Sequence, residues 1–64
     1  MSDWKDRVIN ELEELAIKIK ALDTLISSNP MFTGLSPKQR KLLQLQHTIM
    51  NQYAWVLSER LNNE

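Results

Sequence analysis

Three polar side chains recur at intervals of seven in the second half of this 64-residue chain: Gln46, Tyr53 and Arg60. Seven residues make almost two turns of an α-helix, so on a helix these side chains would form one line. A tyrosine ring can stack on a planar ligand, while arginine and glutamine can hydrogen-bond its polar edge or an attached phosphate. We therefore expect the line to bind a ligand or, alternatively, to fix the alignment of a helical interface.

A second group of candidate residues is large and apolar. Trp55 points away from the apolar side of the same predicted helix, and Met31 and Phe32 precede that helix in the connector. Aromatic side chains are enriched in protein interfaces, so we expect these three residues to contact a protein partner. In the alternative interpretation Trp55 packs on Trp4 or the connector of a neighbouring subunit. Met31 and Phe32 would then close the end of a helical bundle.

The sequence holds no arrangement of side chains that indicates catalysis. The one histidine, His47, has no carboxylate three or four residues away, and we expect it to be an ordinary residue at the border of the apolar face. There is no cysteine, no Glu-x-x-His pattern and no glycine-rich phosphate loop. We expect a protein that is not an enzyme and that holds no cofactor and no metal.

The first half of the chain has the pattern of a long helix that packs against another. Its apolar residues recur at alternating steps of four and three, which is the spacing of a helical seam. They are Val8, Leu12, Leu15, Ile19, Leu22 and Ile26. The pattern stops before Pro30, and a turn is expected at Thr33-Gly34.

A second long helix should begin at Ser36, with Ser36 as the N-cap, Pro37 in the first position and Gln39 in the third. No glycine or proline interrupts it afterwards. The sequence therefore predicts a single all-α domain, an antiparallel helical hairpin. Its parts are a helix over about 3–28, a connector over 29–36 and a helix over about 37–62.

The second helix carries more apolar surface than one partner helix can cover. Its apolar residues span roughly half of the helix circumference: Leu42, Leu43, Leu45, Ile49, Met50, Ala54, Val56, Leu57 and Leu61. Each large side chain left in water forfeits about 1.5–3 kcal/mol of burial. Several together forfeit an amount comparable to the whole stability of a small domain. We expect the hairpins to assemble as a homo-oligomeric bundle, a dimer or higher.

The charges and hydropathy exclude other partners. Eight basic and eight acidic residues cancel, and the longest basic run is Arg40-Lys41, so we expect no nucleic-acid partner. No segment approaches the roughly 20 apolar residues of a membrane span, so we expect no membrane contact. The first residues lack the basic-then-apolar order of a signal peptide, which predicts a cytoplasmic protein.

Two segments carry a resemblance to known proteins. The first helix contains Leu15-x-x-Lys18-Ile19-x-x-Leu22, and the second reads Leu42-Leu43-x-x-Gln46-x-x-x-Met50-x-x-Tyr53-x-x-x-Leu57-x-x-Arg60. With these segments the chain resembles a group of very small two-helix proteins of tailed bacteriophages, including crAss-like phages. The resemblance covers residues 8–61 and implies a phage accessory protein made in the host cytosol.

Phage proteins of broadly similar build include the anti-CBASS and anti-Thoeris sponges, oligomers that sequester cyclic nucleotide signals of bacterial immunity without cleaving them. No ligand residue is carried over from them, because this chain lacks their Tyr-Arg start and Asn-Glu-x-Lys string. The resemblance leads us to expect sequestration of a nucleotide-derived signal. The chemistry and spacing of Gln46, Tyr53 and Arg60 lead us to expect that these residues line its intersubunit pockets. The alternatives are an anti-CRISPR-like inhibitor or adaptor of a host or phage protein, and a purely structural bundle.

Overall fold

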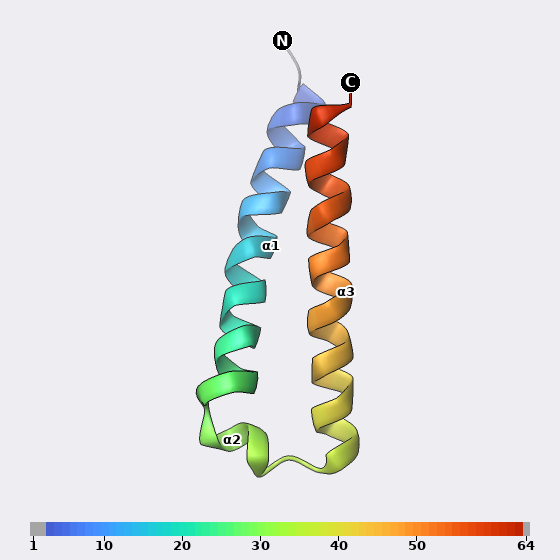
Figure 1. Ribbon diagram of the computed structural model, residues 1–64. Coiled ribbons are helices and arrows are strands. Elements are labelled where there is room, and N and C mark those ends of the chain that lie inside the picture. The colour runs from blue at the N-terminus through green and yellow to red at the C-terminus, as the bar shows by residue number, and fades with distance from the viewer. Residues whose placement is uncertain (1–2, 64) are drawn as a thin grey trace.

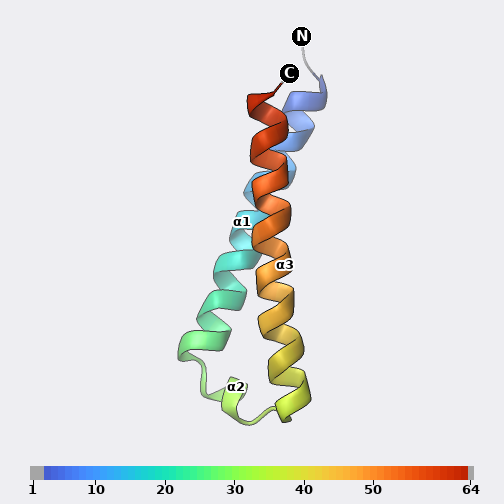
Figure 2. The same ribbon diagram turned by 45° about the vertical axis from the view of Figure 1, so that its right-hand side comes forward.

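In a computed structural model, which describes residues 3–63, the chain forms two long helices and one short one. The helices are α1 (Asp3–Ser28), α2 (Pro30–Thr33) and α3 (Pro37–Asn62), and the described residues contain no strand, so the all-α prediction is confirmed. Helices α1 and α3 lie side by side and run antiparallel, with α2 at the end away from the termini (Figures 1 and 2). The molecule is elongated, 48 × 15 × 13 Å. None of its described helices is long and apolar enough to cross a membrane.

The core is a single line of contacts between α1 and α3. Val8, Leu15 and Leu57 are buried at its centre. Around them pack the partly buried side chains of Leu12, Ile19, Met50, Ala54 and Leu61. The stripe of α3 that faces α1 is buried or half-buried and follows alternating steps of four and three: Leu43, His47, Met50, Ala54, Leu57 and Leu61. Below we call it the inner stripe.

The connector contains a short helix where the sequence predicts only a turn. Asn29 has extended backbone angles and caps α2, its side-chain Oδ1 accepting a hydrogen bond from the Met31 N–H at 2.9 Å. Pro30 follows in the first helical position, where its missing N–H leaves no hydrogen bond unmade. Gly34 then ends α2 with a φ of −81°, a conformation open to any residue.

The predicted start of α3 is confirmed. Ser36 is the N-cap and Pro37 opens the helix. The Ser36 Oγ accepts a hydrogen bond from the Gln39 N–H at 3.2 Å. An N-cap residue followed by proline therefore begins both α2 and α3.

Candidate functional site

Helix α3 has a second apolar stripe, and this one is exposed. Its five side chains are Leu42, Leu45, Ile49, Tyr53 and Val56, each between 44% and 53% exposed. At about 100° per residue, the centre of this exposed stripe lies roughly 115° around α3 from the inner stripe. One protomer thus covers about half of the broad apolar arc on α3 and leaves the other half in contact with water.

The three candidate ligand residues follow one edge of the exposed stripe. Gln46, Tyr53 and Arg60 are all exposed. The Gln46 Nε2 lies 3.8 Å from the Sδ of Met50, which packs against the core, so this edge is the one nearer α1. Within one protomer the three side chains form an open line and no enclosed pocket.

The three candidate partner residues do not share a surface within one protomer. Trp55 is 64% exposed and lies eighteen residues after Pro37 on α3, which is about 27 Å along the helix. Met31, 70% exposed, and Phe32, half-buried, belong to α2 at the opposite end of the molecule. Phe32 lines a hollow of about 350 Å³ with Pro37, Arg40, Lys41 and Gln44.

A larger groove, of about 490 Å³, lies between α1 and α3 on the side away from the exposed stripe. It is lined by Ala16, Ile19, Lys20, Asp23, His47, Asn51 and Ala54. The small side chains of Ala16 and Ala54 leave space between the two helices, and polar groups stand around it. None of the sequence-predicted site residues lines this groove.

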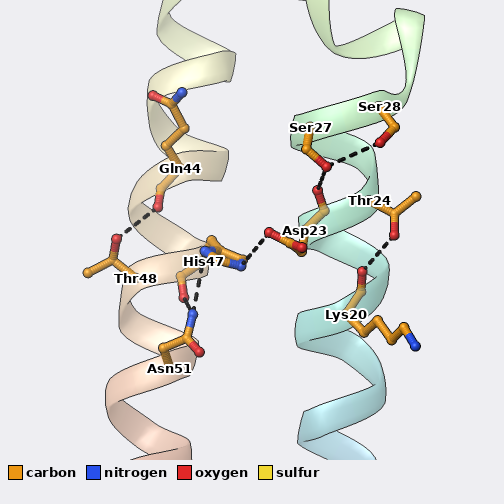
Figure 3. Close-up of polar contacts among 9 residues, drawn as sticks. All are labelled: Lys20, Asp23, Thr24, Ser27, Ser28, Gln44, His47, Thr48 and Asn51. Carbon is orange, nitrogen blue, oxygen red and sulfur yellow. Dashed lines mark hydrogen bonds and ion pairs between the residues drawn. The ribbon is translucent and has the colours of Figure 1, made fainter.

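His47, on α3, lies between Asp23 of α1 and Asn51 of α3, and all three side chains line this groove (Figure 3). Its Nε2 lies 3.5 Å from the Oδ1 of Asp23 on α1, a contact that becomes an ion pair when the ring is protonated. Asn51 Nδ2 donates to the backbone oxygen of His47 at 2.9 Å and lies 3.4 Å from its Nδ1. Among residues 3–63, no three acidic, histidine or cysteine side chains are grouped so as to hold a metal ion.

The contact between His47 and Asp23 is the feature of the site that sequence reasoning missed. A search for carboxylates near His47 along its own helix finds none, because the carboxylate comes from the other helix. One signal was available: His47 occupies a position in the four-and-three spacing of the inner stripe, which turns its side chain toward α1.

A model of the protein family named Sequestin matches residues 2–63, nearly the whole chain. The chain belongs to the Sequestin family. The name denotes sequestration, so this membership supports the sequestering class that the sequence predicts, and it names no ligand. No curated protein and no solved structure matches the chain. The family match does not indicate which surface of a Sequestin family member binds a ligand.

Proposed function

We propose that this protein is a phage accessory protein that counters host immunity by sequestering a nucleotide-derived signal, such as a cyclic nucleotide. It holds the signal unreacted in pockets between subunits, lined by Gln46, Tyr53 and Arg60. Family membership supports sequestration, and the resemblance to small phage proteins supports the phage role. The observation that carries the proposal for the site is that these three side chains lie in line along an uncovered apolar stripe.

Each of the three side chains suits one part of a nucleotide. The Tyr53 ring stacks on a base, and the Gln46 amide both donates to and accepts from the polar edge of a base. Arg60 lies in the last turn of α3, where its guanidinium binds a phosphate through two parallel hydrogen bonds. It is seven residues from Tyr53, about 10 Å along the helix, which leaves room for a sugar between base and phosphate.

A second subunit is needed to complete such a pocket. Small-molecule sites bury most of the surface of their ligand. The side of a single helix is convex, and the exposed stripe of α3 has no wall beyond it within one protomer. Covering the stripe with another chain would supply this wall and remove large apolar side chains from water.

Depletion and recovery of the ligand test this function. The protein is incubated with cyclic dinucleotides, cyclic trinucleotides or cyclic ADP-ribose isomers, the free compound is measured after ultrafiltration, and the protein is then heat-denatured. We expect one class of compound to disappear from the filtrate and to return unchanged after heating. Tyr53→Ala should reduce the depletion, whereas Trp55→Ala, a change on another face of α3, should leave it intact.

Two results would contradict the proposal. Recovery of a chemically altered compound would show catalysis instead of sequestration. Failure of the protein to deplete any of the compounds would remove the nucleotide-derived signal as its ligand.

The exposure of Trp55 and Met31 favours a second candidate function, an anti-CRISPR-like inhibitor or adaptor of a host or phage protein. Under this function Trp55→Ala would abolish capture of the partner protein while folding and self-assembly stay intact. Tyr53→Ala would leave the capture unchanged. Retained capture by Trp55→Ala would count against a role for this residue.

A further inference from the structure

We propose that a second copy of this chain covers the exposed stripe, with the two α3 helices antiparallel and a two-fold axis passing at Ile49. The geometry of the dimer is inferred only from the residue spacing of the exposed stripe and from the distribution of charged side chains. The composite ligand site that the dimer creates rests on the proposed function.

The spacing of the exposed stripe is the same in both directions from Ile49. Its five residues follow steps of three, four, four and three, so the pattern reads identically from either end. A two-fold axis at Ile49 therefore pairs Leu42 with the partner's Val56 and Leu45 with the partner's Tyr53. Ile49 packs against the partner's Ile49. Every member of the stripe then has an apolar or aromatic partner, and a shift of either helix would leave some uncovered.

Charge also favours the antiparallel arrangement. The half of the molecule near the termini, residues 3–17 and 50–63, carries six carboxylates and three basic side chains. The half near the connector, residues 18–49, carries five basic side chains and one carboxylate. Antiparallel packing sets the basic half of each copy beside the acidic half of the other, whereas parallel packing would set like charges together.

The size of the exposed stripe matches a dimer interface. Five side chains that are each about half exposed offer on the order of 100 Å² apiece, judged from the 150–250 Å² that a large ring buries. Two copies would together bury roughly 1,000 Å², the minimum expected of a biological interface and somewhat below the roughly 1,200–2,000 Å² of stable ones. The stripe is thus large enough for a second copy and is a continuous line suited to one helix.

The two-fold axis brings the candidate ligand residues together from different chains. Gln46 lies three residues before Ile49 and Tyr53 four residues after it, so Tyr53 stands within about 1.5 Å, one residue's rise, of the level of the partner's Gln46. Arg60 is eleven residues after the axis, level with the partner's Lys38. Each dimer then has two equivalent sites, and at each one Arg60 and the partner's Lys38 supply cations from different chains that can bind a phosphate.

Disulfide trapping tests this geometry, because the chain contains no cysteine of its own. Single variants Ile49→Cys, Leu42→Cys and Val56→Cys are oxidised mildly and separated by non-reducing electrophoresis. A disulfide needs Cα atoms roughly 4.4–6.8 Å apart. We expect Ile49→Cys to cross-link with itself, Leu42→Cys to stay uncross-linked alone, and a mixture of Leu42→Cys and Val56→Cys to form the mixed dimer. Trp55→Cys, on another face and at a side chain that is 64% exposed, more than those of the stripe, is the control for random collision.

Other results would overturn the geometry. Self-cross-linking of Leu42→Cys as efficient as that of Ile49→Cys would show parallel helices, and no cross-link above the Trp55→Cys control would exclude this interface. The proposed function fails separately. A cross-linked Ile49→Cys dimer that depletes no nucleotide would overturn the function and leave the dimer standing, whereas nucleotide depletion without any cross-link would overturn the dimer alone.

Discussion

At the scale of single residues, Tyr53 belongs both to the exposed stripe and to the line of Gln46, Tyr53 and Arg60. An aromatic ring that closes an apolar interface can also stack on a flat ligand inserted there. Gln46 and Arg60 would orient a ligand through hydrogen bonds, and they contribute less apolar surface to the interface than Tyr53 does. Among the three, Tyr53 is therefore the residue whose loss should affect both ligand binding and assembly, whereas loss of Gln46 or Arg60 should affect mainly ligand binding.

Tyr53→Ala should weaken binding of the nucleotide-derived signal by roughly 5- to 150-fold, which corresponds to the 1–3 kcal/mol that stacking on one base provides. Tyr53→Phe keeps the ring and should bind nearly as well as the unmodified protein. Isothermal titration calorimetry measures both. If Tyr53→Ala instead dissolves the oligomer while no ligand is found for any variant, the line of Gln46, Tyr53 and Arg60 is a structural device for alignment.

The line Gln46, Tyr53 and Arg60 could be found from the sequence because it lies on one helix, where spacing alone determines the face. The pairing of His47 with Asp23 could not, because it depends on how far one helix is shifted along the other. That shift is set by packing of the core, and spacing within one helix does not contain it. The groove between Ala16 and Ala54 escaped prediction for the same reason.

At the scale of helices, local chemistry determines most of the architecture. The apolar steps of four and three in α1, and the Ser36 cap before Pro37, are signals that need no knowledge of the rest of the chain. Helix α2 was not predicted, because four residues are too few to show a period. Its start does use the same pair of features, a capping side chain at Asn29 and then a proline.

Gly34→Ala should stabilise the protein by about 0.4–1 kcal/mol, because alanine has fewer conformations to lose on folding. The φ of Gly34 is −81°, and a Cβ added there would lie 3.5 Å from the Met31 carbonyl oxygen, an ordinary contact. Urea unfolding followed by circular dichroism measures the change. A loss of stability would mean that the connector needs the freedom of glycine.

Ser36→Ala, at the start of α3, should lower the free energy of unfolding, which is the opposite of the change expected for Gly34→Ala. It removes the hydroxyl that accepts from the Gln39 N–H, so we expect a loss of about 0.5–2 kcal/mol in the free energy of unfolding. The same urea titration applies. An unchanged midpoint would show that water satisfies this N–H equally well.

At the scale of the whole molecule, a net charge of zero conceals an uneven distribution. The acidic side chains in the first half of α1 and Glu59 of α3 are far apart in sequence and come to the same end only because the chain folds back on itself. Five of the eight basic side chains lie in the half near the connector in the same way. The width of the apolar arc on α3 predicts a second copy from the sequence, whereas the direction of pairing that we propose depends on the folded arrangement.

Ile49→Glu should convert the dimer to a monomer, because it sets two carboxylates against each other at the two-fold axis in an apolar surrounding. Size-exclusion chromatography with light scattering measures the mass. Trp55→Glu, the same change at an exposed site on another face, should leave the dimer intact. Dissociation by Trp55→Glu with no effect of Ile49→Glu would place the interface on the tryptophan face.

Native mass spectrometry of the purified protein, alone and with each cyclic nucleotide and cyclic ADP-ribose isomer, tests the central claim most directly. We predict a discrete dimer of the 7.5 kDa chain that gains the mass of two ligand molecules from one class of compound and of none from the others. A chain that stays monomeric throughout, or a dimer that takes up none of these compounds, would contradict an oligomer that sequesters a nucleotide-derived signal between its subunits.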